Sequence, residues 1–306
     1  MRIFLYECIC AGGLGRQAPA SLRHEGYAML EAVVWDFQQM GGIEVVTLLD
    51  EEARFADSAL SCDWTLVIAP EFDDLLRNHS QTVLDVGGRL LGSSPQAIGC
   101  TADKLETAGI WRQRGVPHPR TESVGTDFSP PCVLKPRHGA GSQATTLVYE
   151  RREWEPVWDA ARTEWPRDEF LVQQYVAGQP ASVALLIGKA QTIPLLPAWQ
   201  HLSSDGRFRY EGGSLPLPKP LSDRAIQLAL KAVAGIDGLQ GYVGVDLVLG
   251  DAGDDYAIEI NPRLTTSYLG LRQLCQQNLA ELILRLAQGE AIIAPTWHAG
   301  EIRFQA

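Results

Sequence analysis

The first 95 residues alternate short apolar runs with longer segments of helical periodicity. Three apolar strands are expected, at Ile3–Tyr6, Ile43–Leu49 and Trp64–Ala69. Two helices are expected, each ended by a glycine pair, at Leu22–Met40 and at Glu71–Val86. Strands and helices in this alternation predict a small parallel sheet with helices on both faces.

The rest of the chain has a different pattern. A helix is expected over 101–114, with Thr101 as its N-cap and Gly115 at its exit, before Pro117 and Pro119 force an extended link. Antiparallel strands are expected at 131–135, 144–149, 169–174, 181–187, 191–197, 242–249 and 256–261, and helices at about 153–164, 222–235 and 268–287. The predicted fold class is therefore an α/β N-terminal unit followed by an α+β unit of antiparallel sheets with flanking helices.

Composition narrows the classes of function. The 306 residues are 45% hydrophobic and 21% charged, which is an ordinary globular composition with room for more than one packed domain. The formal net charge of -11 disfavours a nucleic acid or an anionic membrane as partner, because phosphate groups attract Lys and Arg. No segment reaches the roughly 18 apolar residues that span a bilayer, and Met1 to Cys8 reads as a strand rather than a signal peptide. Six cysteines without metal-type spacing indicate reduced core thiols and a cytoplasmic protein.

Two carboxylates face each other in a predicted hairpin. The strands 242–249 and 256–261 flank the turn 251–254, and pairing Gly250 with Asp255 places Asp246 directly opposite Glu259. Asn261 shares the face of Glu259, while Tyr256, Ile258 and Ile260 are expected on the opposite face, towards the core.

Opposed like charges destabilise a sheet unless something neutralises them. Two carboxylates and an amide oxygen suit a hard cation such as Mg²⁺, which would also bridge phosphate oxygens. The alternative is a solvated sheet face, which the apolar strand around Asp246 makes harder to explain.

Two lysines and a glycine-bearing loop are candidate phosphate ligands. Lys135 ends an apolar strand and precedes the loop 137–142, in which Gly139, Gly141 and Ser142 could present backbone amides to an anion. A plain hairpin turn would look similar. Lys104 lies in the first turn of a helix, where a cation is unfavourable unless an anion neutralises it, although a solvent-facing lysine remains the alternative.

The segment after the strand 169–174 is a candidate hinge. Gln173, Gln174, Tyr175 and Val176 follow an apolar run, and Gly178 lets the chain turn. Such a hinge could offer backbone groups to the edge of an adenine ring and a side chain to its face, or be an ordinary strand end.

Together these segments resemble the ATP-grasp superfamily. The order of Lys104, Lys135 with its glycine loop, the Gln-Tyr-Val hinge, Asp246 and the Glu259–Arg263 stretch matches over about residues 90 to 290. The N-terminal unit resembles the pre-ATP-grasp domain. The resemblance implies three parts, which are a pre-ATP-grasp domain at 1–95, a small ATP-grasp subdomain at 96–176 and a metal-binding subdomain at 177–306.

The resemblance also implies roles for the site residues. Lys104 and Lys135 would contact the ATP phosphates, the loop from Gly139 to Ser142 would close over them, and the hinge from Gln173 to Val176 would hold adenine. Asp246, Glu259 and Asn261 would bind Mg²⁺ or Mn²⁺. Arg263 would stabilise the transferring phosphoryl group or an acyl phosphate. The family reaction activates a carboxylate with ATP and joins it to an amine.

The chain departs from the family pattern at two positions. Pro180 stands where a ribose-binding Glu often follows the hinge. Gly244 stands where many relatives carry an Arg, two residues before the first metal-binding Asp, so that Arg263 would take over the function of that side chain.

A closer resemblance is to the tyramine–glutamate ligases of methanofuran biosynthesis. It rests on Phe4–Glu7 before Gly12-Gly13, on Gln174–Gly178 leading to Ala181–Val183, and on the stretch from Glu259 to Tyr268. It implies glutamate as the acid and an aromatic amine as the acceptor, with a homodimer left open as the assembly.

The acceptor site is expected between the N-terminal sheet and the C-terminal unit. Glu7 with Gly12 and Gly13 could hold an ammonium group, unless Glu7 is simply a solvent-facing charge at a strand end. Further candidates for the acceptor site are Tyr210, Gly212 and Gly213. Arg207 and Arg209 could hold a second carboxylate, although solvated charges on a strand are the favoured alternative for both.

Three other functions compete with the ligase. Another ATP-grasp chemistry, such as carboxylation or a phosphate-releasing kinase, would use the same nucleotide site. A non-catalytic ATP-binding regulatory module would bind nucleotide without turnover. A dinucleotide-binding oxidoreductase is suggested only by Gly12-Gly13-Leu14-Gly15, which lacks the full spacing of the dinucleotide fingerprint.

Overall fold

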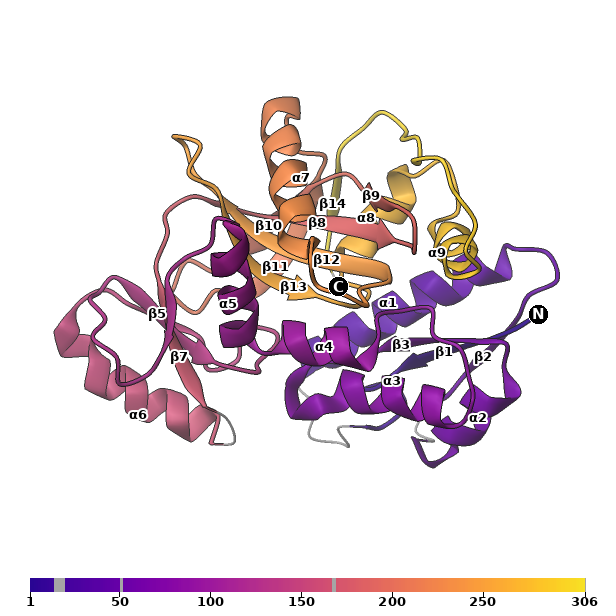
Figure 1. The fold of residues 1–306 in the computed structure, drawn as a ribbon, viewed down its shortest axis with the longest axis horizontal. Helices are drawn as coiled ribbons and strands as arrows, with labels where there is room; N and C mark the ends of the chain where they lie inside the picture. The colour runs from indigo at the N-terminus through magenta and orange to yellow at the C-terminus, as the bar shows by residue number, and fades with distance from the viewer. Residues whose placement is uncertain (14–19, 50–51, 167–168, 306) are drawn as a thin grey trace.

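The computed structural model describes residues 1–13, 20–49, 52–166 and 169–305. Within these ranges the chain forms a parallel three-stranded sheet, an antiparallel four-stranded sheet and an antiparallel seven-stranded sheet. Figure 1 shows the three-stranded sheet and its helices at one end of the molecule, the four-stranded sheet with α6 at the other, and the large sheet between and above them. None of the described helices has the length and apolar character that a membrane-spanning segment requires.

The N-terminal unit has the predicted parallel topology. Its sheet runs in the order β2-β1-β3, with β1 at the centre. The elements are β1 (Arg2–Glu7), α1 (Ala20–Gln38), β2 (Glu44–Thr47), a 3-10 turn (Glu52–Arg54), α2 (Phe55–Ser61), β3 (Trp64–Ile68), a second 3-10 turn (Phe72–Asp74) and α3 (Leu75–Asp85). The two expected helices and three expected strands are present, with ends that shift by a few residues.

Two short helices, rather than one, lead into the rest of the chain. They are α4 (Pro95–Ala102) and α5 (Lys104–Arg114). The prediction that Thr101 caps a single helix is wrong, because Asp103 is the N-cap and its carboxylate accepts hydrogen bonds from the backbone nitrogens of Leu105 at 3.0 Å and Glu106 at 3.2 Å. Gly115 ends α5 in a left-handed conformation, as expected.

The four-stranded sheet has the order β4-β7-β5-β6. Its elements are β4 (Thr121–Ser123), β5 (Cys132–Pro136), β6 (Thr146–Val148), a 3-10 turn (Arg151–Glu153), α6 (Trp154–Glu164) and β7 (Phe170–Gln174). A small core that includes Leu134, Ala161 and Phe170 packs α6 against one face of this sheet. Residues of the other face line a cavity.

The large sheet has the order β13-β12-β8-β10-β11-β14, with β9 paired to β8. Its strands are β8 (Gln179–Ile187), β9 (Thr192–Pro194), β10 (Ala198–Leu202), β11 (Tyr210–Leu215), β12 (Gly241–Leu249), β13 (Tyr256–Asn261) and β14 (Ile302–Phe304). Strands β10, β11 and β14 were not predicted from the sequence. The helices of this unit are α7 (Lys219–Val233), α8 (Ser267–Leu274) and α9 (Leu279–Ala287).

The expected helix at 268–287 is two helices. Asn278 caps α9, and its side-chain oxygen accepts hydrogen bonds from the backbone nitrogens of Ala280 and Glu281. One core covers an outer face of the large sheet with α7. Another joins α8 and α9 to α1 and β1, so the N-terminal unit and the large sheet share one continuous hydrophobic core.

Candidate active site

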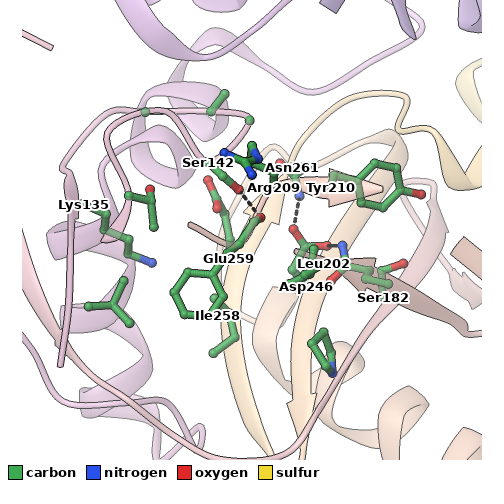
Figure 2. Close-up of a pocket in the computed structure, with 18 of the residues that line it drawn as sticks. Lys135, Ser142, Ser182, Leu202, Arg209, Tyr210, Asp246, Ile258, Glu259 and Asn261 are labelled. Carbon is green, nitrogen blue, oxygen red and sulfur yellow. Dashed lines mark hydrogen bonds between the residues drawn. The ribbon is translucent and has the colours of Figure 1, made fainter. Parts of the chain in front are cut away.

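A cavity of about 620 Å³ lies between the four-stranded sheet and the large sheet. Its walls come from β5 and β7 on one side, from β8, β10, β12 and β13 on the other, and from the N-terminal part of α1. Most of the site residues that the sequence predicts line it, namely Lys104, Lys135, Gly139, Gly141, Ser142, Gln173, Gln174, Tyr175, Val176, Asp246, Glu259, Asn261 and Arg263. Figure 2 shows Lys135 on one wall and Asp246, Glu259 and Asn261 on the other.

The two carboxylates of the hairpin are paired as the sequence predicts. Asp246 on β12 lies directly opposite Glu259 on β13. The next pair is Leu247 with Ala257, so a β-bulge leaves Ile258 without a partner across the ladder. The expectation that Ile258 faces the core is therefore wrong, because the bulge brings it to the cavity wall, while Ala257 and Ile260 are buried.

Asp246 is held by two side-chain amides. Gln200 donates a hydrogen bond to Oδ1 at 2.9 Å and Asn261 donates one to Oδ2 at 3.0 Å. Burial and the nearby charge of Glu259 raise the pKa of Asp246 to about 7, although both amides oppose the shift. A divalent cation bound beside Asp246 would favour its ionised form and so oppose this shift.

The residues present therefore fit a hard divalent cation. Asp246 and Glu259 offer carboxylate oxygens and Asn261 offers an amide oxygen, which are the donors that Mg²⁺ and Mn²⁺ accept. No cluster of three or more His, Cys, Asp or Glu side chains suited to a metal occurs in the described ranges. A cation here would thus be held by few protein ligands, in the way that Mg²⁺ is held when substrate phosphates complete its shell.

The two lysines are both buried and both point into the cavity region. Lys104, the first residue of α5, forms an ion pair with Glu259 at 3.1 Å and donates a hydrogen bond to the carbonyl of Gly139 at 2.6 Å. Lys135 donates a hydrogen bond to Oε1 of Gln173 at 2.9 Å. Burial lowers the pKa of Lys135 to about 8, with the charge of Lys104 adding to the shift.

Gln173 acts on Lys135 rather than facing the hinge. Its amide nitrogen donates to Thr121 at 2.9 Å while its oxygen accepts from Lys135, so the side chain is fixed between the two. The backbone nitrogens of Gln174 and Tyr175 donate to the carbonyls of Arg120 and Pro131, at 2.8 and 3.3 Å. These bonds anchor the hinge to the four-stranded sheet. Pro180, at the position where the family often has a ribose-binding Glu, also lines the cavity.

The glycine loop closes against the large sheet. The hydroxyl of Ser142 donates to the carbonyl of Phe208, in the connection between β10 and β11, at 2.7 Å. Gly141 has a positive φ of 66°, which favours glycine, and a Cβ there would lie 3.8 Å from the side chain of Leu22 on α1. The loop thus contacts both the large sheet and the N-terminal unit, and it covers part of the cavity.

Arg263 bridges the site to the N-terminal unit. Its Nε and Nη2 donate to the two carboxylate oxygens of Glu71 at 2.9 and 3.1 Å, and its Nη1 donates to the carbonyl of Leu264. Burial disfavours the charge of Arg263, but Glu71 outweighs burial and raises the pKa of the guanidinium. Arg263 is therefore a fixed cation at the edge of the cavity.

The structure does not bring the predicted acceptor residues at the N-terminus to the cavity. Glu7 is buried at 2% exposure, where its carboxylate accepts a hydrogen bond from the backbone nitrogen of Cys10 at 2.7 Å and lies against Gly26. Gly12 and Gly13 form a turn after β1, closed by the bond from the nitrogen of Gly13 to the carbonyl of Cys8. These three residues stabilise the turn that leads towards α1.

Of the other acceptor candidates, Tyr210 and Arg209 line the cavity. Arg209 forms an ion pair with Asp205 at 2.7 Å, and Arg207 with Glu164 at 2.5 Å, so both side chains already hold a carboxylate. Gly212 and Gly213 pack closely on β14 and Phe304 instead of facing the cavity.

Helix α1 also contributes to the cavity, which was not predicted from the sequence. Leu22, Glu25 and Met29 line the cavity from this helix. Their spacing of three and four residues places them on one helix face, and a lone carboxylate between two apolar side chains on that face is the signal that was available.

Two family models match the chain. The ATP-grasp domain matches residues 101–267, and the pre ATP-grasp 3 domain matches residues 33–98. The chain is similar to the tyramine–L-glutamate ligase of Methanocaldococcus fervens, with 32% identity over 260 residues that cover 84% of this chain and 78% of the relative. It is similar to the tyramine–L-glutamate ligase of Methanocaldococcus jannaschii, with 32% identity over 75% of this chain and 64% of that protein.

Solved structures agree on the fold. An ATP-grasp superfamily protein from Archaeoglobus fulgidus has a TM-score of 0.74 and 25% identity, covering 96% of this chain and 90% of that one. A biotin carboxylase from Campylobacter jejuni has a TM-score of 0.73 at 14% identity, covering 98% of this chain and 74% of that one, which is a likeness of fold alone. The predicted fold class is confirmed. The chain belongs to the ATP-grasp family, and its named relatives support the enzyme class of an ATP-dependent carbon–nitrogen ligase.

Proposed function

We propose that this protein uses ATP to join the carboxylate of glutamate to an aromatic amine such as tyramine. The observation that carries the proposal is the opposed pair of Asp246 and Glu259 in one cavity with Lys104 and Lys135. Two acids that face two buried lysines form a site for a cation and a polyphosphate together, because each needs a counter-charge that the other brings. The names of the two ligases from Methanocaldococcus support the choice of acid and amine.

The reaction would proceed in two steps. A carboxylate oxygen of glutamate attacks the γ-phosphorus of ATP, which gives an acyl phosphate and ADP. The neutral amine then attacks the acyl carbon, phosphate leaves with the bonding electrons, and the new amide nitrogen loses a proton. Neither step needs a nucleophile from the protein, so the side chains act by positioning and by neutralising charge.

The predicted nucleotide and metal residues keep their roles in this proposal, whereas Glu7, Gly12 and Gly13 do not. Lys104 and Lys135 neutralise the phosphates, and the hinge from Gln174 to Val176 lies where an adenine ring would meet the four-stranded sheet. Asp246, Glu259 and Asn261 would hold Mg²⁺ or Mn²⁺, whose chemistry is to neutralise phosphate oxygens and orient the nucleotide. The three-part division at 1–95, 96–176 and 177–306 remains part of the proposal.

Arg263 and the glycine loop would act on the intermediate. The guanidinium of Arg263, fixed by Glu71, is placed to neutralise charge on the transferring phosphoryl group. The loop around Gly141 and Ser142 would exclude water, which matters because an acyl phosphate hydrolyses readily.

An ADP-release assay with Mg²⁺-ATP, glutamate and a panel of amines that includes tyramine tests the proposal. We expect ADP formation that requires both the acid and the amine, and a product whose mass equals that of the amide. ADP formation with bicarbonate or with the acid alone would instead favour carboxylation or a kinase. ATP binding without turnover across the panel would favour a regulatory module.

A further inference from the structure

Glu25 is a carboxylate in the wall of the active-site cavity that the reaction scheme above does not use. It lies on α1 of the N-terminal unit, and Leu22 and Met29 flank it on the same helix face. The family model for the pre ATP-grasp 3 domain begins only at residue 33, so this segment lies outside both matched domains. The N-terminal unit thus contributes a charged group directly to the cavity.

The carboxylate of Glu25 has no partner among the residues that the structure describes. No hydrogen bond contributes to its electrostatic environment, and burial raises its pKa above the ordinary value. Only the more distant positive charge of Arg263 opposes that shift. A half-buried carboxylate without a partner is costly, and side chains of this kind are kept where a ligand supplies the missing charge.

Of the other acids that line or adjoin the cavity, Glu211 is exposed and the remaining three are paired. Asp246 accepts two amide hydrogen bonds, Glu259 pairs with Lys104, and Glu71 pairs with Arg263 through both oxygens. Because Arg263 is occupied by Glu71, it is not available to form a direct ion pair with Glu25. Within the part of the chain that the structure describes, no cation pairs with Glu25, so a cationic group that enters the cavity would supply its counter-charge.

The surroundings of Glu25 favour a monovalent organic cation over a second metal ion. Its wall is formed by the apolar side chains of Leu22 and Met29 and by Tyr210, whose hydroxyl bonds to Thr266. A single carboxylate beside apolar and aromatic groups suits an alkylammonium, which needs one counter-charge and apolar contact for its carbon chain. A divalent cation would require several more oxygen ligands.

We propose that Glu25 binds the ammonium group of an amine-bearing substrate. The inference rests on the proposed ligase function and names the residue that recognises the amine. Two substrates carry this group, the α-ammonium of glutamate and the ammonium of the acceptor amine, and the same carboxylate chemistry would hold either. An acceptor bound as its ammonium would pass one proton to the Glu25 carboxylate before its neutral amine attacks the acyl carbon. In this assignment Glu25 takes the part that the sequence analysis gave to Glu7.

The test compares Glu25→Gln with Glu31→Gln. Both changes remove one negative charge from α1, but Glu31 is exposed and lies outside the cavity. We expect Glu25→Gln to raise the KM of one amine-bearing substrate by about ten- to a hundredfold, because an ion-paired hydrogen bond is lost. The KM of ATP should stay within about twofold of the wild-type value. Glu31→Gln should leave all three constants unchanged.

Substrate analogues that lack the amine show which of the two substrates Glu25 binds. Glutarate replaces glutamate without its α-ammonium, and if Glu25 holds that group the wild-type preference for glutamate over glutarate should disappear in Glu25→Gln. If Glu25 holds the acceptor instead, that preference stays and the KM of tyramine rises. Unchanged KM values for both substrates would overturn the proposal.

Binding measurements separate this inference from the ligase assignment. If the wild-type protein turns over no acid and amine, the proposed function fails. Calorimetry still tests Glu25, because it compares the affinity for tyramine with that for 4-ethylphenol, which lacks the ammonium group, in wild type and in Glu25→Gln. If wild type and Glu25→Gln prefer tyramine over 4-ethylphenol equally, and also prefer glutamate over glutarate equally, the role of Glu25 is overturned independently of catalysis.

Stability distinguishes a binding role from a structural one. If Glu25 serves a ligand, the ligand-free Glu25→Gln protein should unfold at the same or a higher urea concentration than wild type, since it no longer buries an unpaired carboxylate. A lower midpoint would assign Glu25 to the structure of α1 and overturn the proposal.

Discussion

Arg263 and Glu71 lie 192 residues apart in the chain and form a two-point ion pair, with nitrogen–oxygen distances of 2.9 and 3.1 Å. Glu71 follows β3 of the N-terminal unit, and Arg263 follows β13, whose Glu259 faces the cavity. The side chains are 5% and 16% exposed, so the pair is largely shielded from water. The N-terminal unit therefore fixes the orientation of a cation that belongs to the candidate active site.

Glu71→Gln should weaken both folding and catalysis. The change leaves the buried charge of Arg263 uncompensated, and losing one partner of a buried ion pair costs about 3–5 kcal/mol. We expect a lower urea midpoint and a lower kcat, with the KM of ATP little changed, because Arg263 would no longer be held against the transferring phosphoryl group.

A second buried ion pair supplies the control for Glu71→Gln. Asp36 on α1 accepts two hydrogen bonds from Arg272 on α8, at 3.0 and 2.6 Å, away from the cavity. Asp36→Asn should also lower the urea midpoint but leave kcat intact. Equal losses of kcat in the two variants would mean that Arg263 contributes only through stability.

Glu259→Gln should abolish turnover while leaving the fold intact. The change removes one of the two carboxylates proposed to hold the metal, so ADP release should fall more than about a hundredfold and should not recover at high Mg²⁺. Circular dichroism and urea unfolding report the fold. Asp251→Asn, in the exposed turn of the same hairpin, is the matched control and should behave as wild type. ADP production that persists in Glu259→Gln would remove the metal assignment.

The hairpin shows how far sequence patterns reach. The pairing of Asp246 with Glu259 could be predicted because a short turn fixes the register and alternation fixes the faces. The bulge at Ile258 could not, because it depends on how two strands pack against the rest of the sheet. The strands β10 and β11 were missed because the segment 198–215 carries polar and glycine residues where a half-buried strand would alternate.

The ends of helices and the acceptor site also could not be predicted from local sequence patterns. Thr101 and Asp103 are both good capping residues, and only the position of α5 against the loop that carries Arg137 decides for Asp103. Glu7 and Glu25 are both acids near the N-terminus. Which of them faces the cavity depends on the packing of α1 beside the large sheet, which no local pattern encodes.

The pH dependence of kcat/KM for ATP should follow the protonation state of Lys135. Burial lowers its pKa to about 8 in the absence of nucleotide, so the amine is charged below this pH and neutral above it. Because a neutral amine cannot neutralise phosphate, kcat/KM for ATP should fall as pH rises through about 8, by up to tenfold per pH unit. A pH–rate profile at fixed Mg²⁺ measures this decrease.

Two variants control the assignment of that decrease. Lys135→Met should give a low kcat/KM for ATP that no longer falls above pH 8, whereas Lys189→Met, at an exposed position, should retain the wild-type profile. A decrease that persists in Lys135→Met would have to come from another group.

Gly178 connects the hinge that we propose to hold adenine to the large sheet, and its replacement should affect ATP binding more than a comparable change elsewhere. Its φ is 157°, and a Cβ at this position would lie 2.6 Å from the carbonyl oxygen of Leu249. Gly178→Ala must therefore shift the hinge away from β12, which should raise the KM of ATP and lower the urea midpoint.

Gly253→Ala is the control, since Gly253 also has a positive φ of 91° but open space around it. It should cost about 1 kcal/mol of stability through backbone strain, without changing the KM of ATP. If both variants left the KM of ATP unchanged, the hinge would not be the adenine site.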